Sequence, residues 1–243
     1  MNSAQPDYGA AGRLGLGTPQ GNPTVEAEFR RLMPKDVEYY TVRLTSNSDD
    51  PHTRLLEYIQ HLPEFVSRYA TLRLDGFLFA CTGSSYLLTE DVGRRYADAA
   101  AETLGAPVIL AADAVAHWLE GQAATSIVLL SPYPDWLNKP AVNYWTSRGY
   151  EVRACAQVDI GSGDTYGIYE QQSGDALRAA STLLDTKADA FVMTGTGMPG
   201  LPLVKKLRGE GRPVISSNVA LANAGLELLG VAPPPESDWH IPD

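Results

Sequence analysis

One cysteine lies where a reactive thiol would be expected. Cys81 follows the apolar run 76–80 and precedes the small residues 82–85. This pattern is typical of a strand that ends and a helix that begins, and backbone N–H groups at a helix start lower the pKa of a thiol. The same groups can bind a carboxylate. We therefore predict that Cys81 is an acidic, catalytic thiol beside a carboxylate site, with a simply buried cysteine as the alternative.

Two further side chains are suited to binding a carboxylate. Tyr133 follows the apolar run 126–130 and lies between two prolines, so its phenol has a fixed direction and can donate to a carboxylate oxygen. Asn22 follows a glycine-rich stretch and precedes Pro23; it is expected either to cap the next helix or to point its amide into a cleft. The second cysteine, Cys155, lies inside a strand-like run and is expected to be structural.

Residues 195–200 fit the pattern G-x-G-x-x-G, which binds dinucleotides in Rossmann folds. The next strand ends in Ser-Ser-Asn at 216–218, in place of the acidic residue that binds the ribose, and Pro199 removes an amide from the turn. We therefore expect no nicotinamide or flavin cofactor. The four histidines are scattered without metal-ligand spacing, so no metal site is predicted.

Short apolar runs alternate with longer amphipathic stretches along the chain, which is typical of an α/β fold with mostly parallel sheets. The expected strands are residues 13–16, 37–43, 76–79, 108–110, 126–130, 151–158, 190–193 and 214–216. The expected helices are residues 23–32, 50–70, 89–104, 112–120, 138–148, 172–184, 202–208 and 220–229.

The two halves of the chain contain the same series of motifs in the same order. Residues 79–83 and 193–197 each follow an apolar run and precede a helix and then a Pro-Val-Ile triplet. We predict two pseudo-symmetric lobes, each a mostly parallel sheet flanked by helices. Because ligands bind at the carboxyl ends of parallel strands, the loops at Cys81 and Gly195 should face one cleft. Chance similarity between two βα units is the alternative.

The predicted domain boundaries follow from this repeat. Residues 12–120 plus 215–230 are assigned to lobe 1, and residues 121–214 to lobe 2. Residues 1–11 are expected to form a flexible N-terminus and 231–243 a surface tail, because both lack an apolar period.

Composition excludes several classes of partner. The chain has 243 residues, with 19 basic against 29 acidic and a formal net charge of −10, which disfavours nucleic acid. The apolar runs are far shorter than the roughly 20 residues of a membrane-spanning helix. The start of the chain does not resemble a signal peptide, so a soluble, cytoplasmic protein without a membrane partner is expected.

Together these motifs resemble the maleate isomerase and arylmalonate decarboxylase group of the aspartate/glutamate racemase superfamily, from about residue 13 to 230. Residues 19–26 (Pro-Gln-Gly-Asn-Pro-Thr-Val-Glu) are similar to the family's Pro-Ser-Ser-Asn-Thr-Thr-Val-Glu loop, whose Asn contacts the substrate carboxylate. Residues 80–82 resemble the first catalytic-cysteine motif, and residues 131–133 resemble the strand end that carries the tyrosine.

The resemblance implies two lobes that each supply one active-site residue, a small dicarboxylate substrate, and neither a cofactor nor a metal. Family members are often homodimers, so a dimer is an open expectation. Donors to the substrate are then expected from Asn22, Tyr133, Thr82 and the amides around Gly83, Gly195 and Thr196. Thr165 lies near the place where isomerases carry another Asn.

The chain departs from the family motif at one position, and this narrows the set of possible reactions. Where the family carries a second cysteine, this chain has Thr194-Gly195-Thr196, which argues against racemisation by two opposed bases. The main hypothesis is a cis-trans isomerase of the maleate isomerase type, in which the Cys81 thiolate adds to a double bond, rotation follows and elimination restores the alkene. The alternative is an arylmalonate decarboxylase-like enzyme with Cys81 as proton donor. A non-catalytic protein that binds a small carboxylate is the third hypothesis.

Overall fold

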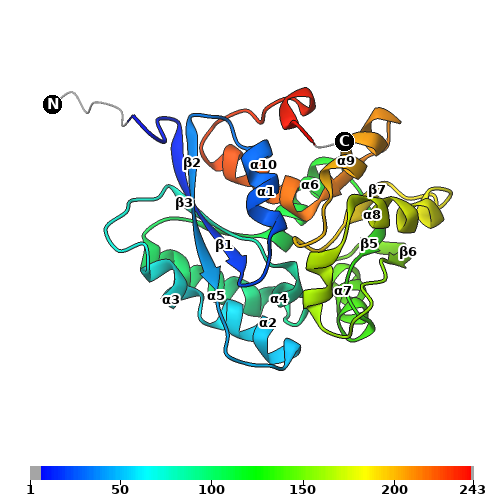
Figure 1. Cartoon of the computed structure of the whole chain (residues 1–243), viewed down its shortest axis with the longest axis horizontal. Helices are drawn as coiled ribbons and strands as arrows, with labels where there is room; N and C mark the ends of the chain where they lie inside the picture. Colours follow the sequence, from blue (N-terminus) through cyan, green and yellow to red (C-terminus); the bar gives the residue numbers. More distant parts are fainter. Residues whose placement is uncertain (1–6, 242–243) are drawn as a thin grey trace.

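Two four-stranded sheets, each with all strands parallel, form the framework of the computed structural model, which describes residues 7–241 (Figure 1). The first sheet has the order β2-β1-β3-β4 and the second the order β6-β5-β7-β8, so both halves have the same topology. The predicted α/β class with two similar lobes is thereby confirmed. The strands are β1 (Gly12–Pro19), β2 (Val37–Leu44), β3 (Gly76–Phe79), β4 (Val108–Leu110), β5 (Ser126–Ser131), β6 (Glu151–Gln157), β7 (Ala190–Met193) and β8 (Val214–Ser216).

Helices cover both sheets. They are α1 (Thr24–Leu32), α2 (Pro51–Gln60), α3 (Leu62–Ser67), α4 (Thr82–Tyr86), α5 (Glu90–Leu104), α6 (Ala111–Gly121), α7 (Asp135–Ser147), α8 (Ser173–Ala180), α9 (Leu201–Gly209) and α10 (Ser217–Leu228), with 3₁₀ turns η1 (Thr165–Glu170), η2 (Ser181–Leu183) and η3 (Glu236–Trp239). The helix expected at 50–70 is divided at His61, because Pro63 has no N–H to continue α2. Helix α10 begins earlier than expected, since the Ser216 hydroxyl caps it by accepting from the Val219 N–H.

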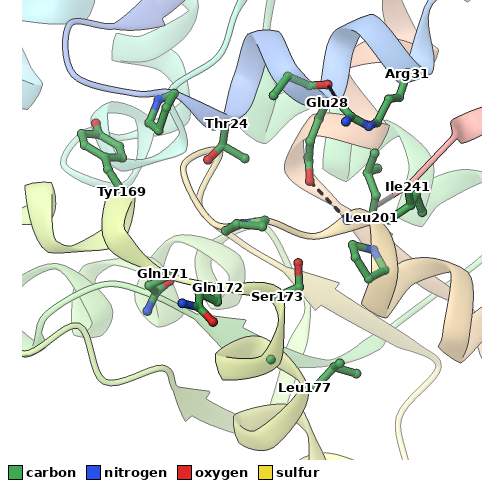
Figure 2. A pocket seen from close by; sticks show the side chains of 15 residues that line it. Thr24, Glu28, Arg31, Tyr169, Gln171, Gln172, Ser173, Leu177, Leu201 and Ile241 are labelled. Atoms are coloured by element: carbon green, nitrogen blue, oxygen red, sulfur yellow. Dashed lines mark hydrogen bonds between the residues drawn. The ribbon is translucent and has the colours of Figure 1, made fainter. Parts of the chain in front are cut away.

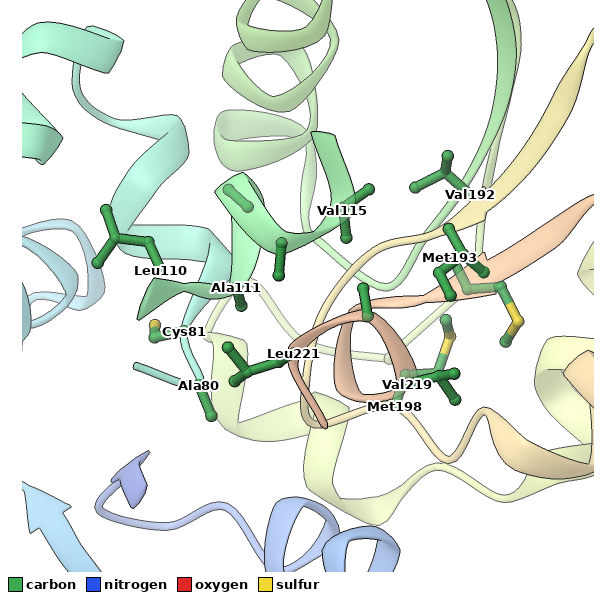
Figure 3. Close-up of a cluster of buried hydrophobic side chains, with 14 of the residues drawn as sticks. Ala80, Cys81, Leu110, Ala111, Val115, Val192, Met193, Met198, Val219 and Leu221 are labelled. Atoms are coloured by element: carbon green, nitrogen blue, oxygen red, sulfur yellow. The ribbon is translucent and has the colours of Figure 1, made fainter. Parts of the chain in front are cut away.

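The lobes meet through a shared apolar layer. Helix α10 packs against α1, α6, β3 and β4 of lobe 1 and against β8 of lobe 2, and α1, α6 and α10 lie between the two sheets in Figure 1. Figure 3 shows the buried cluster at this junction, where Cys81 and Ala111 lie on one side and Met193 and Met198 on the other. The loops that follow β3 and β7 are therefore held rigidly against each other.

One predicted boundary differs from the structure. Residues 215–230 were assigned to lobe 1, but β8 pairs with β7 of the second sheet, with Val192 opposite Ile215. Ile215 and Ser216 therefore belong to lobe 2, and the chain crosses to lobe 1 only in α10. The reason is that a Pro-Val-Ile strand completes each sheet in the repeat, so β8 is the counterpart of β4.

Both chain ends are more ordered than expected where the structure describes them. Trp239 is buried, the Arg208 side chain of α9 donates to the Glu236 carboxylate at 2.7 Å, and Arg31 of α1 donates to the His240 carbonyl, so residues 236–241 dock onto both lobes instead of forming a loose tail. The buried Trp239 ring anchors this otherwise polar segment to the body of the protein. At the other end Arg13 donates to the carbonyl of Tyr8 at 2.9 Å. The remaining expectations, for residues 1–6 and 242–243, fall outside the described residues.

Candidate active site

A small cavity lies between the loops that follow β3 and β7. Its volume is about 20 Å³, and its wall combines residues of both lobes. The structure brings every predicted site residue except Thr82 to this wall, and Thr82 lies directly behind it. The lining residues are Pro19, Asn22, Leu55, Cys81, Gly83, Tyr133, Thr165, Ile168, Tyr169, Gly195, Thr196 and Gly197. The sequence suggested the loop 161–169 as part of the pocket wall, but it did not single out Ile168 or Tyr169 and gave no indication of Leu55.

Cys81 is a buried thiol at the start of α4. Its sulfur lies 3.2 Å from the Ser84 Oγ, which also lies 2.6 Å from the Leu55 carbonyl oxygen. The Ser84 hydroxyl has one proton, which is shared between the carbonyl oxygen and the sulfur, and the carbonyl contact is the shorter. Ser84 is therefore only a weak donor to the sulfur and stabilises a thiolate little.

The expectation of an acidic thiol is corrected by this environment. Burial raises the pKa of the Cys81 thiol, and hydrogen bonds from Ser84 and the Gly83 amide oppose the rise only in part. Helix α4 has five residues, too few for a strong dipole, and none of the described residues that line the cavity is a cation. The apolar cluster of Figure 3 adjoins the sulfur and removes it from water.

A pair of hydroxyls, one from each lobe, lies next to the thiol. The Thr82 Oγ1 and the Tyr133 phenol are 2.6 Å apart, and the Gly195 N–H donates to Thr82 at 3.3 Å. Burial raises the pKa of Tyr133 well above its ordinary value, so the phenol is neutral and can donate. If Thr82 gives its proton to Tyr133, the phenolic proton is free for a substrate oxygen. The arrangement is that of an oxyanion-binding site in a small, buried cavity.

Asn22 fulfils both roles that its position suggested. Its Oδ1 accepts from the N–H groups of Thr24 and Val25 and so caps α1, while its Nδ2 donates to the Thr196 Oγ1 at 3.4 Å across the lobes. Thr196 in turn donates to the Ala80 carbonyl at 2.7 Å. Because that proton is committed, Thr196 is not placed to act as an acid in the position of the missing second thiol.

The loop after β7 is also held by a buried carboxylate that sequence patterns did not single out. Glu28 Oε1 accepts from the Gly200 and Leu201 N–H groups at 2.7 and 3.2 Å, and Figure 2 shows this side chain reaching from α1 toward Leu201. Asn218 Nδ2 donates to Glu28 at 2.8 Å and to the Thr196 carbonyl at 3.0 Å. Lobe 1 therefore fixes the backbone of the loop that carries Thr196.

Residues 159–172 of lobe 2 cover the cavity. Within this cover segment, Asp164 forms an ion pair with the buried Arg54 of α2, whose guanidinium carbon lies 4.0 Å from the centre of the Tyr166 ring. The Arg54 side chain also lies 3.5 Å from the Thr165 hydroxyl, which lines the cavity, and Gln20 donates to the Tyr166 phenol at 2.7 Å. A cavity of this size holds about one water molecule, so a dicarboxylate can bind only after a movement.

Residues 7–241 contain neither a cluster of metal-ligating side chains nor a long apolar helix. No group of three or more His, Cys, Asp or Glu side chains is arranged to hold a metal ion there. Within the same residues no helix has the length and apolar character needed to cross a membrane.

Comparisons with known proteins agree with the fold and identify the family. Residues 75–238 match the family model described as arylmalonate decarboxylase. Among solved structures, a Cys-to-Ser variant of the Nocardia farcinica maleate cis-trans isomerase, with a covalently bound succinylcysteine intermediate, is 26% identical with a TM-score of 0.80, over 90% of this chain and 93% of that chain. No curated protein matches the sequence.

Two further solved structures share the fold. A variant of the maleate isomerase Iso from Pseudomonas putida S16, crystallised with maleate, is 20% identical with a TM-score of 0.80, over 90% of this chain and 92% of that chain. An arylmalonate decarboxylase is 17% identical with a TM-score of 0.73, over 93% and 96%. The family match spans more than half of the chain, so the resemblance seen in the motifs is confirmed: this protein belongs to the arylmalonate decarboxylase family of the Asp/Glu racemase-like superfamily.

Proposed function

We propose that the protein is a cofactor-independent, Cys81-dependent decarboxylase of small 2-substituted malonates. The observation that carries this proposal is that the cavity holds a single thiol, which is buried and has a raised pKa, while the matching position in the other lobe is Gly195. Decarboxylation needs one proton donor on one face of the substrate carbon. A neutral thiol is suited to that role, and the family match supports it.

The reaction uses the residues of the cavity in order. Loss of carbon dioxide breaks one carbon–carbon bond, whose electron pair passes to the remaining carboxylate as an enediolate. The Tyr133 phenol, with Thr82 behind it, and the Asn22 amide donate hydrogen bonds to the enediolate oxygens. The Cys81 S–H then gives its proton to the carbon, and the resulting thiolate takes a proton from water.

Cis-trans isomerisation is the second candidate, supported by a different observation. The Nocardia farcinica variant lacks one cysteine and still holds a succinylcysteine. By analogy, Cys81 alone would be able to add to a maleate-type double bond, send the electron pair to the neighbouring carboxylate, and leave again after rotation. This reaction requires the thiolate, so it must first overcome the raised pKa of Cys81.

Substrate panels separate the two reactions. Arylmalonates and alkenylmalonates are expected to release carbon dioxide and give an optically enriched acid that carries one deuterium when the reaction is run in D₂O. Maleate and methylated maleate, followed by proton NMR, test for fumarate-type products. We expect C81A to lower kcat/KM by about 10²- to 10⁴-fold, and C155A to leave it unchanged.

Three results would change the proposal. Turnover of maleates but not of malonates would replace decarboxylation by isomerisation. Full activity of C81A would contradict both proposed reactions, because each depends on the Cys81 thiol. Tight binding of a dicarboxylate without any turnover would support the third hypothesis, a non-catalytic protein that binds a small carboxylate.

A further inference from the structure

Tyr169 separates the Cys81 cavity from a much larger groove. The groove, about 700 Å³, lies between α1, the start of α8 and the start of α9 (Figure 2). Among the residues that the structure describes, Tyr169 alone lines both the groove and the cavity. Tyr169 therefore marks the place where the groove and the cavity adjoin.

The Tyr169 ring fits between two glycines. A β-carbon at Gly197 of lobe 2 would lie 2.7 Å from the Cε1 of Tyr169, and one at Gly21 of lobe 1 would lie 3.1 Å from the Cε2. Any side chain at Gly197 would displace the ring, and one at Gly21 would crowd it. Two loops from different lobes thus leave a slot that the aromatic ring fills.

The side chains that line the groove are suited to admit an anionic acid with an apolar substituent. Arg31 lines it, and the guanidinium donates to the carbonyls of Ala27 and His240, so its direct partners carry no full charge. On a chain with a net charge of −10, Arg31 supplies a local attraction for a dianion in a groove wall that also holds the Glu28 carboxyl, whose pKa is raised by burial. Ala27, Leu177 and Leu201 provide apolar wall for a substituent.

We propose that Tyr169 is the gate of the active site: the groove is the route by which a dicarboxylate reaches Cys81, and the ring limits the size of what passes. Rotation of one side chain joins the two spaces, whereas the cover segment remains tied to lobe 1 through Arg54 and Gln20. The alternative route is lifting of the whole cover segment. The gate is a property of the chain's geometry, and only the identity of the passing acid rests on the proposed function.

Alkylation of Cys81 tests the gate without any enzymatic activity. The full-length protein is treated with iodoacetamide or with the larger N-phenylmaleimide, and labelling of Cys81 and Cys155 is followed by peptide mass spectrometry. Cys155 lines neither space and serves as the internal control. We expect Y169A to accelerate Cys81 labelling by about tenfold or more, since the opening step no longer requires ring movement. The gain should be larger for the larger reagent, because a change in thiol pKa alone would accelerate both alike.

Three variants make the result decisive. Y169F keeps the ring and should label at the wild-type rate, and Y169L is the smaller change if Y169A does not fold. Y166A removes a tether of the cover segment and should also stay near the wild-type rate. If Y166A and Y169A accelerate Cys81 labelling equally, or if Y169A does not accelerate it, the proposal that Tyr169 is the gate is wrong.

Charge selectivity tests the route itself. R31Q is expected to lower the ratio of iodoacetate to iodoacetamide labelling at Cys81 by about two- to threefold at low salt, with no change at Cys155. An unchanged ratio would place the route elsewhere. If no malonate or maleate is turned over by the wild type, the proposed function fails while these labelling results still decide the gate.

Discussion

Gly195 lies directly against the ring of Pro132. A β-carbon at position 195 would lie 2.5 Å from the Pro132 Cγ, and the backbone there has φ of +89°, which favours glycine. This is the place where the sequence resemblance puts the family's second cysteine. In this chain the backbone has therefore become incompatible with a side chain, and the one-thiol site is built into the fold.

Restoring the second cysteine should damage the protein. We expect G195C and G195A to lower the free energy of unfolding by about 2 kcal/mol or more, because both the positive φ and the Pro132 contact oppose a β-carbon. Urea unfolding of each variant measures the loss. G195A/P132A should recover part of it, and G121A, where a β-carbon meets nothing within 4 Å, should change the stability by no more than about 1 kcal/mol. Wild-type stability of G195C would contradict this account of the missing thiol.

The thiol chemistry should differ from the sequence-based expectation. Because Cys81 is buried with a raised pKa and Cys155 is partly exposed, we expect iodoacetamide at neutral pH to label Cys155 faster in the wild type. A C155A variant gives the rate of Cys81 alone. The raised pKa also means that the folded state keeps the Cys81 proton longer than the unfolded state. Stability should then fall as the pH rises above about 8.5 in wild type, and this loss should be smaller in C81A, in which only Cys155, whose pKa burial also raises, still contributes as a thiol.

The positions of the site residues could be predicted, but their electrostatics could not. Cys81 and Tyr133 each follow an apolar run, and in parallel sheets strand ends meet at one edge, so local patterns sufficed to place them. The pKa of Cys81 depends on packing against residues distant in the sequence, and a short local motif does not contain that information. The same holds for Glu28 and Tyr169, whose partners are distant in the sequence and whose local patterns are those of an ordinary helix and an ordinary loop.

The paired hydroxyls should act as one unit. We expect Y133F and T82V each to lower kcat by about 10- to 10³-fold with a smaller effect on KM, since the donated hydrogen bond strengthens as charge develops on the enediolate. The double variant should lose little more than either single variant, because removing one hydroxyl already disables the pair. Steady-state kinetics on a substrate of the wild type measures these losses. Y150F, which removes a buried hydroxyl that contacts the distant Ala116 carbonyl, is the matched control. Additive losses would mean that the two hydroxyls work separately.

Glu28 should make stability depend on pH. Burial raises the pKa of its carboxyl, against the hydrogen bonds from Asn218, Gly200 and Leu201 and the charge of Arg31, which lower it. The folded state therefore holds this proton to higher pH than the unfolded state, whose Glu titrates near 4.3, and stability is lost as pH rises from about 4.3 through the folded pKa. E28Q has no such proton. Its unfolding free energy relative to wild type should rise over this range by about 1.4 kcal/mol for each unit by which the pKa is raised.

Urea unfolding between pH 4 and 8 provides the measurement, with E102Q on the exposed face of α5 as control. E28L separates charge from hydrogen bonding, because it leaves the Gly200 and Leu201 amides without their acceptor and should cost about 1–3 kcal/mol at every pH. E28Q keeps an acceptor oxygen for those amides and should retain more activity than E28L, since the Thr196 loop stays in place. If the unfolding free energy of E28Q changes with pH in the same way as that of E102Q, the carboxyl of Glu28 is not the titrating group that this structure indicates.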